Sequence, residues 1–220
     1  MAAIAHRLEH GLVHVPAYFD AAEQNALCAD VLAVIAVAPL FAPRMPKTGK
    51  SFSVRMTNCG AMGWVSDRER GYRYELTHPE TGRAWPAIPP LALRAWRELG
   101  RYALAPEACL INFYDAAARM GLHQDRDEAD LAAPIVSLSL GCSCIFRWRG
   151  PTRTGETCAI ELASGDAVLL AGPARLAFHG VARILPANSP AVSALLPGGG
   201  RFNLTLRRVT KRPGLTPPPS

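Results

Sequence analysis

Two segments in the first half of the chain have the spacing of amphipathic helices. In residues 20–38, Asp20 precedes an apolar run and Glu23 follows three positions later, which is the pattern of a capping box, and Pro39 ends the run. Residues 89–104 begin with two prolines and then place apolar side chains roughly on one side of a helix. The pattern predicts two helices, separated by a long segment rich in glycine, proline and aromatic residues.

The second half has the pattern of a β-protein. From about Cys109 onward, short apolar runs are separated by glycine, proline and aspartate turns. Seven short strands in succession are typical of a sandwich or jelly roll. These strands are expected at residues 108–114, 134–141, 143–149, 157–162, 166–171, 175–180 and 201–209. Residues 185–200 are expected to form a long flexible loop, and the proline-rich residues 211–220 a flexible tail.

The length and composition suit a single domain with one core. The chain has 220 residues, of which 49% are hydrophobic, and this is enough for a substantial core. We find neither a basic and apolar leader nor a run of the ~20 apolar residues that cross a bilayer, so we expect a cytoplasmic protein outside the membrane. The six cysteines have no zinc-like spacing and are expected to be buried and reduced.

The formal net charge of +6 comes almost wholly from arginine, since only Lys47, Lys50 and Lys211 are lysines. The guanidinium group forms paired hydrogen bonds with phosphates and carboxylates, so the charge favours a polyanionic partner. The alternative is a genome that encodes arginine often, and charge alone does not decide between the two explanations.

Three residues of the second half could hold a metal ion. In the run HQDRDE, His123 and Asp125 are two positions apart, so in an extended segment their side chains point to the same side. His179, near the end of the predicted strand 175–180, is the other histidine of this half. Two histidines and one carboxylate form a facial triad, which suits non-haem iron(II) and leaves coordination positions open. The alternative for the first pair is a solvated histidine and aspartate in a charged turn.

The last predicted strand offers a face that could bind an anion. Alternation along RFNLTLRR places Arg201, Asn203, Thr205 and Arg207 on one face and three apolar residues on the other. The two arginines lie roughly 20 Å apart at ~3.3 Å per residue, so they cannot share one small carboxylate. One could bind the far carboxylate of a dicarboxylic cosubstrate while the other points back toward the metal. The alternative is an ordinary exposed strand face.

Several separated motifs cover most of residues 50–210: MTNCGAMGW, GYRY, WPAIP, LINFYDAAARMGLHQDRDEADLAAPIVSLSLG, FHG and RFNLTLRR. Together and in this order they resemble the AlkB family of iron(II)- and 2-oxoglutarate-dependent dioxygenases. The resemblance implies an α+β fold, namely a double-stranded β-helix (jelly roll) with N-terminal helices packed on the sheet and a nucleotide-recognition lid. It implies one domain over residues 1–210, with the lid and a supporting helix at about 40–105 and the β core at about 106–210.

The resemblance also implies the cofactor, the cosubstrates and the residues that bind them. Fe(II) would be bound by His123, Asp125 and His179, with 2-oxoglutarate and O2 as cosubstrates. The residues expected to bind 2-oxoglutarate are Asn112, Tyr114, Arg201, Asn203 and Arg207. Such an enzyme converts 2-oxoglutarate to succinate and CO2 and hydroxylates a methyl group on a base nitrogen, which then leaves as formaldehyde.

The implied substrate is N-alkylated nucleic acid, such as 1-methyladenine or 3-methylcytosine in DNA, with RNA as an alternative. Trp64 and the ring of His123 would sandwich a flipped base, and Asp127 would favour a positively charged lesion. The residues expected to bind substrate are Trp64, Tyr72, Arg73, Tyr74, Asp127 and Arg153. We expect a monomer that acts preferentially on single-stranded alkylated DNA.

Two features depart from the family pattern. The segment between His179 and Arg201 is long and contains LPGGG, and Leu170 stands where a tryptophan is expected. Neither feature changes a metal ligand. Two other functions stay open: a dioxygenase that acts on a methylated substrate other than nucleic acid, and a module that binds damaged bases without catalysis. The second would require the loss of a metal ligand.

Overall fold

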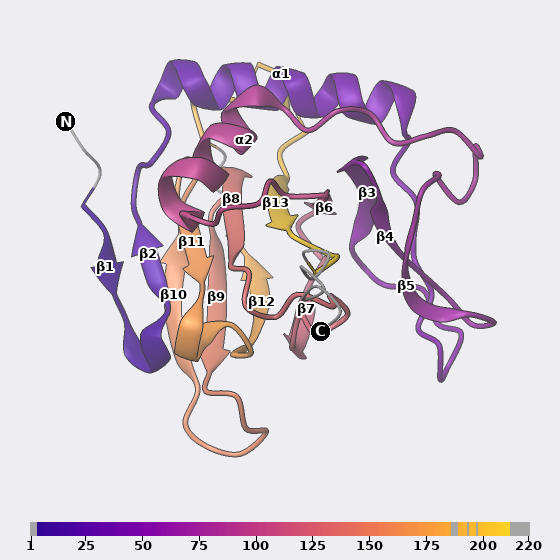
Figure 1. Cartoon of the computed structure of the whole chain (residues 1–220). Coiled ribbons are helices and arrows are strands. Elements are labelled where there is room, and N and C mark those ends of the chain that lie inside the picture. The colour runs from indigo at the N-terminus through magenta and orange to yellow at the C-terminus, as the bar shows by residue number, and fades with distance from the viewer. Residues whose placement is uncertain (1–3, 186–188, 193, 197, 212–220) are drawn as a thin grey trace, which may run out of the picture.

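The computed structural model describes residues 4–185, 189–192, 194–196 and 198–211, so the predicted tail lies outside the described residues except for Lys211. Two antiparallel sheets pack face to face, as the predicted double-stranded β-helix requires. Helices α1 and α2 lie together along one side of the strands, with β1 and β2 at one end of the molecule and the β4–β5 hairpin at the other (Figure 1).

The larger sheet has, in spatial order, β1 (His6–Arg7), β2 (Val13–Val15), β11 (Ala167–Leu170), β8 (Ile135–Gly141), β13 (Arg201–Arg207), β6 (Ala108–Tyr114) and β3 (Arg55–Gly60). The smaller sheet has β10 (Cys158–Leu162), β9 (Cys144–Arg149), β12 (Phe178–Ile184) and β7 (Met120–His123). A separate hairpin joins β4 (Gly63–Asp67) to β5 (Gly71–Glu75). The helices are α1 (Ala21–Val37) and α2 (Pro90–Ala95), with short helical turns at Glu9–Gly11, Trp96–Gly100 and Gly172–Ala174.

Strand β13 separates the apolar core from the polar interior of the barrel. Its residues Phe202, Leu204 and Leu206 are buried in the cluster that joins the larger sheet to the helices. Each such side chain contributes ~1.5–3 kcal/mol when buried. The alternate residues Arg201 and Arg207 line a cavity between the sheets. The predicted alternation is confirmed, and the alternative of an exposed strand face is wrong.

Helix α1 begins and ends where the sequence predicts. Asp20 accepts a hydrogen bond from the amide of Glu23 at 2.8 Å, and Glu23 accepts one from the amide of Asp20 at 3.2 Å, which completes the capping box. The second predicted helix is shorter than expected. α2 ends at Ala95, one wider turn follows to Gly100, and Arg101 takes a left-handed conformation with φ of 47° that stops the helix.

Strands β3, β4 and β5 occupy the segment between the helices, for which the sequence pattern predicted no element. β3 is buried on both faces although it contains Thr57 and Asn58. Thr57 donates to the carbonyl of Ala38 at 2.8 Å, and the amide of Asn58 donates to the carbonyl of Trp64 at 3.0 Å. These distant partners satisfy the polar groups, so the strand shows no alternation of apolar and polar residues.

Two smaller expectations are corrected. His179 lies at the start of β12, not at the end of a strand, because the residues before it form a helical turn. Within the predicted loop at 185–200, Val192 and Leu196 are buried in the core. Five cysteines are buried as expected, but Cys158 is partly exposed.

The tryptophans outside the candidate site are packing residues: Trp85, Trp96 and Trp148 are buried. No helix in the described part of the chain is long and apolar enough to cross a membrane.

Candidate active site

A cavity of about 480 Å³ opens between the two sheets, and His123, Asp125 and His179 line it together. β7 pairs with β12 so that His123 lies directly opposite His179, and Asp125 follows two residues after β7 ends. A β-carbon on Gly180 would lie only 2.5 Å from the carbonyl oxygen of Met120, so the close approach of these strands requires glycine at this position.

The three side chains form a compact set of ligand atoms. Nε2 of His123 lies 3.6 Å from Oδ1 of Asp125, and Nε2 of His179 lies 3.6 Å from Oδ2 of the same carboxylate. One ligand atom from each residue can be chosen so that all three lie within 4.8 Å of one another. In the described part of the chain, Oδ2 of Asp125 is buried and has no hydrogen-bond partner. A metal ion would satisfy this orphaned oxygen, so the donor set fits Fe(II).

The backbone fixes which ring nitrogen of each histidine faces the cluster. Nδ1 of His123 lies 3.0 Å from the carbonyl oxygen of Gly121, and Nδ1 of His179 lies 3.0 Å from that of Ala177. A carbonyl only accepts hydrogen bonds, so each Nδ1 carries the proton and donates it. Each Nε2 therefore has a free lone pair directed at the space beside Asp125, which is the arrangement of metal-binding histidines.

Electrostatics favour an ionised Asp125 and a neutral His123. Burial opposes the charge on Asp125, but Arg207, whose Nη2 lies 2.9 Å from Oδ1, and the two histidines hold its pKa well below the usual range. Partial burial, with the adjacent His179, lowers the pKa of His123. Metal ligands must be deprotonated, and these shifts keep Asp125 and His123 in that form at neutral pH.

Arg201 is a buried cation at the inner end of the same cavity. Its side chain donates to Oγ of Ser139 at 2.7 Å and to the carbonyl of Cys142 at 3.2 Å, and it is 1% exposed. Within the described residues, no carboxylate pairs with this guanidinium, and its Nε has no partner. Burying a charge without a partner of opposite charge costs free energy, so we expect an anionic ligand to bind at this position. The far carboxylate of 2-oxoglutarate fits this requirement.

All of the residues that were expected to bind the metal and 2-oxoglutarate line this one cavity. Besides the three metal-ligand candidates, its lining includes Asn112, Tyr114, Arg201, Asn203 and Arg207. Oδ1 of Asn112 is buried without a partner among the described residues. The amide of Asn203 is held by Oγ of Ser137 at 2.7 Å.

The mouth of the cavity carries aromatic rings and a carboxylate. The rings of Trp64 and Tyr72 are stacked, with centroids 5.5 Å apart and an interplanar angle of 23°. The indole Nε1 of Trp64 donates to Oδ2 of Asp127 at 2.8 Å. Arg153 also lines the cavity, and its guanidinium lies 5.6 Å from the ring centroid of Phe178.

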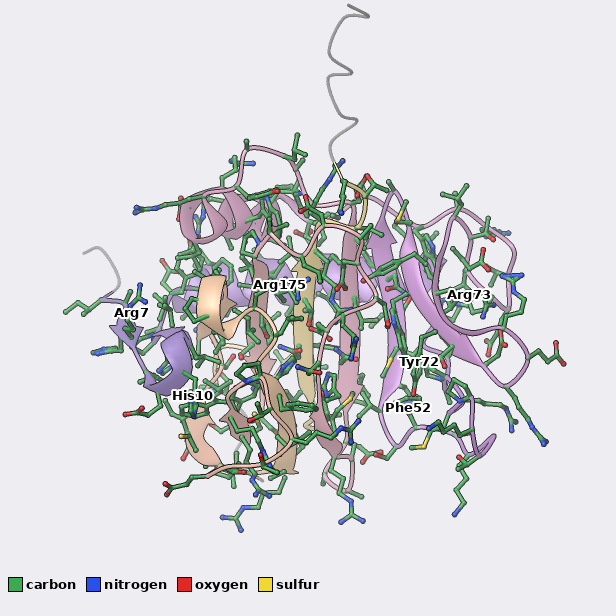
Figure 2. All side chains as sticks on the ribbon, turned by 60° about the horizontal axis from the view of Figure 1, so that its bottom comes forward. Arg7, His10, Phe52, Tyr72, Arg73 and Arg175 are labelled. Atoms are coloured by element: carbon green, nitrogen blue, oxygen red, sulfur yellow. The ribbon has the colours of Figure 1, made fainter. Side chains whose placement is uncertain are left out.

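Two residues expected at the substrate site do not line the cavity. Arg73 pairs instead with Asp67 at 2.7 Å and Glu75 at 2.6 Å. Figure 2 shows Arg73 farther out on the hairpin than Tyr72. Neighbouring residues of a strand point to opposite faces, so Tyr72 and Arg73 cannot both face the cavity. The hydroxyl of Tyr74 donates to Glu128 at 2.5 Å, beneath the cavity wall.

A buried network of charged side chains lies beside the three metal-ligand candidates and was not predicted from the sequence. Glu128 pairs with Arg175 at 3.1 Å and with Arg207 at 3.2 Å, and its side chain is 0% exposed. Arg175 also donates to the carbonyl of Asp125 at 2.7 Å. The network thus fixes the backbone of a candidate metal ligand and the arginine beside it. In the sequence, the charged run around Glu128 is typical of a solvated turn, and Arg175 has no local signal.

Removing Glu128 is expected to destabilise the fold. Glu128→Ala leaves Arg175 without a carboxylate partner in the described part of the chain, and the loss of one partner of a buried ion pair costs about 3–5 kcal/mol. Urea unfolding of the metal-free protein measures the free energy of unfolding. Glu69→Ala, at an exposed turn, is the control and should change it by less than about 0.5 kcal/mol. Equal effects of the two substitutions would contradict the expectation.

Comparison with known proteins agrees with this geometry. The sequence model of the 2OG-Fe(II) oxygenase superfamily matches residues 11–207. A Caulobacter vibrioides (strain NA1000 / CB15N) protein, named alpha-ketoglutarate-dependent dioxygenase AlkB homolog, is 53% identical over 193 residues, which are 88% of this chain and 85% of the relative. The chain belongs to the AlkB family.

Other AlkB relatives extend the similarity. The alpha-ketoglutarate-dependent dioxygenase AlkB of Escherichia coli (strain K12) is 40% identical over 198 residues, which are 88% of each chain. The solved structure of OsALKBH1 superposes with a TM-score of 0.77 at 28% identity and covers 93% of this chain and 100% of that one. This AlkB-family protein is therefore a dioxygenase with Fe(II) as cofactor and 2-oxoglutarate and O2 as cosubstrates.

Leu170 stands where a tryptophan was expected from the family pattern. Its side chain is 1% exposed and lines the cavity.

Proposed function

We propose that this protein repairs N-alkylated nucleic-acid bases by oxidative dealkylation, with alkylated DNA as substrate. The proposal rests on one arrangement: the stacked rings of Trp64 and Tyr72 and the carboxylate of Asp127 lie together in the lining of the metal-binding cavity. Aromatic faces bind a flipped base with ~1–3 kcal/mol of stacking. The carboxylate complements the positive charge of 1-methyladenine or 3-methylcytosine.

The names of further relatives support a nucleic-acid substrate. DNA N(6)-methyladenine demethylase ALKBH1D of Arabidopsis thaliana is 40% identical over 47% of this chain. The tRNA demethylase abh1 of Schizosaccharomyces pombe is 39% identical over 38% of this chain. RNA is therefore the second candidate substrate. We favour single strands, because an unpaired base costs less to flip into a cavity.

We assign His123, Asp125 and His179 as the ligands of Fe(II). The protonated Nδ1 atoms anchor both rings to the backbone, and the Nε2 lone pairs face the site. Arg207 holds the carboxylate of Asp125 in place at 2.9 Å. When bound with 2-oxoglutarate and O2, Fe(II) supplies the oxidising chemistry that hydroxylates the methyl carbon, and formaldehyde, succinate and CO2 are released.

Arg201 is assigned to the far carboxylate of 2-oxoglutarate. Its position on β13 beside Ser139 sets the direction of the guanidinium, and its buried charge strengthens the attraction. Asn112 and Tyr114 on β6, with Asn203 and Arg207 on β13, complete the proposed set that binds this cosubstrate.

We assign the hairpin β4–β5 to the nucleotide-recognition lid within residues 40–105 of a single domain. It carries Trp64 and Tyr72 to the cavity mouth. Phe52 packs edge-on against Trp64 with centroids 6.3 Å apart, and Figure 2 shows Phe52 and Tyr72 close together. The side chain of His123, 39% exposed, also lines the cavity, and we assign it to the opposite face of the base. Arg153, at the rim of the cavity, completes the proposed substrate site.

The test of this function is direct turnover. The protein is loaded with Fe(II) and 2-oxoglutarate without oxygen and then exposed to air with short DNA or RNA oligonucleotides that contain 1-methyladenine. Mass spectrometry should show the loss of one methylene equivalent, with formaldehyde release, and His123→Ala should abolish both. Succinate formation without demethylation of any oligonucleotide would refute the proposal and direct the search to a different methylated substrate.

Replacing Asp127 is expected to alter lesion preference. Asp127→Asn retains an acceptor for Trp64 but removes the charge, and a hydrogen bond to a charged group contributes ~1.5–3 kcal/mol. We therefore expect kcat/KM to fall about 10-fold for cationic 1-methyladenine and to change little for neutral 1-methylguanine. Competition between the two lesions in oligonucleotides of equal sequence measures the ratio. An equal decrease for both lesions would show that Asp127 has no role in charge recognition.

A further inference from the structure

The outer face of the smaller sheet is basic. In β9, Phe146 and Trp148 are buried, whereas Arg147 between them is exposed. In β12, Arg183 is exposed, and Arg119 is exposed immediately before β7. Strands β7, β9 and β12 contain Arg147, Arg149 and Arg183 and no carboxylate, and the fourth strand, β10, contains one, Glu161. The outer face, with Arg119 at its border with the active-site cavity, therefore carries net positive charge.

A groove of about 330 Å³ runs across this face. Arg119 and Arg147 line it, and its floor includes the bare backbone of Gly121 and Gly180. A β-carbon on Gly121 would meet nothing within 4 Å, so the floor is open to an extended ligand. A shallow floor of backbone flanked by guanidinium groups suits a chain of phosphates.

The arginines of this face have no acidic partner in the described part of the chain. Some arginines elsewhere have such a partner, as Arg94 has in Glu23 at 2.5 Å. The guanidinium groups of Arg119, Arg147 and Arg183 take part in no ion pair or hydrogen bond among the described residues. Glu161 of the adjacent β10 lies opposite Ile145 and not opposite Arg147.

The groove adjoins the active-site cavity. Residues 119–122, Gly180 and Val181 line both spaces. β7 is the edge strand of the smaller sheet, and its pairing with β12 is irregular between His179 and Val181. A strand that leaves the cavity mouth over β7 therefore reaches the groove directly.

We propose that this groove binds the phosphate backbone of the substrate strand beyond the flipped nucleotide. The inference rests on the proposed function and extends it, because it makes affinity depend on the length of the nucleic acid. Arg147, which lines the groove, and Arg183, which is exposed next to the lining residue Ala182, contact phosphates that a short oligonucleotide does not have. For single strands, each contact adds about 0.7 to the slope of log affinity against log salt concentration.

The test compares binding of oligodeoxynucleotides of about 5 and about 15 nucleotides. Mn(II) replaces Fe(II) in the protein with 2-oxoglutarate, and fluorescence anisotropy gives the Kd. In Arg147→Gln/Arg183→Gln, we expect the Kd for the longer strand to rise about 10-fold and the salt slope to fall by about 1.4, with the shorter strand changed less than about 2-fold. Arg7→Gln/Arg97→Gln, which removes the same charge at exposed positions, should leave both values unchanged.

The outcomes separate this inference from the function on which it rests. Wild-type protein that binds and demethylates oligonucleotides, together with a double variant that has the same Kd for both lengths, would refute the groove alone. Equal weakening for both lengths would also refute it. Absence of nucleic-acid binding by the wild type would refute the function itself.

Discussion

Replacing Arg201 by methionine is expected to raise the KM for 2-oxoglutarate by about 10²–10³-fold. We assign this guanidinium to the far carboxylate of the cosubstrate, at the inner end of the cavity where it is 1% exposed. Loss of one partner from a buried ion pair costs about 3–5 kcal/mol, and each 1.4 kcal/mol corresponds to a factor of ten. Steady-state succinate formation at varied 2-oxoglutarate concentrations measures the effect.

The same substitution should change the stability of the protein without ligands only slightly. Methionine loses the hydrogen bonds to Ser139 and Cys142, each contributing about 1 kcal/mol, but it also removes a buried charge that no carboxylate offsets in the described part of the chain. We therefore expect the free energy of unfolding to change by no more than about 2 kcal/mol.

Wild-type protein should be stabilised by added 2-oxoglutarate with Mn(II), whereas Arg201→Met should gain far less at the same concentrations. Arg97→Met, on an exposed helical turn, is the matched control and should behave as wild type. An unchanged KM in Arg201→Met would remove this residue from the 2-oxoglutarate site. A KM increase of similar size in the control would show that the loss of positive charge, and not the position, is responsible.

Replacing His179 by alanine is expected to reduce demethylation at least about 10³-fold. Substitutions of residues that only orient metal ligands cost about 10–100-fold, and the loss of a ligand should cost more. The ring lies in the cavity with Nε2 3.6 Å from Asp125 and is fixed by the carbonyl of Ala177. Removing it leaves two of the three proposed ligands.

Metal binding provides a measurement that does not depend on turnover. Calorimetric titration with Mn(II) should give a clear affinity for wild type and for His6→Ala, whose histidine is exposed on β1. His179→Ala should bind Mn(II) at least about 100-fold more weakly while its urea midpoint without metal stays close to that of wild type. A variant with normal metal affinity and lost activity would refute the assignment of His179 as a ligand.

The sequence by itself determined the features that depend on local periodicity. The capping box of α1, the approximate places of the seven predicted strands and the two faces of β13 follow from residues that are near one another in the chain, although β12 begins and ends later than predicted. The spacing of His123 and Asp125, with His179 as the other histidine of the strand-rich half, predicted a metal site before the sheets were known, with a solvated turn as the alternative. A metal site can be recognised in the sequence because only a few residue types, such as histidine and aspartate, bind iron.

Only the tertiary structure decided features that depend on partners distant in sequence. β3 is a strand because Ala38 and Trp64 satisfy its polar side chains. Tyr72 faces the cavity and Arg73 does not, because Asp67 and Glu75 hold the arginine on the outer side.

The same reason explains the charged groups around the site. Glu128 belongs to a run that is typical of a solvated turn, yet it is buried, because Arg207, 79 positions away, neutralises it. Arg147 and Arg119 share a groove because β7 and β9 both neighbour β12. The free energy of burying or exposing a charge depends on which groups surround it, and only the folded chain brings those groups together.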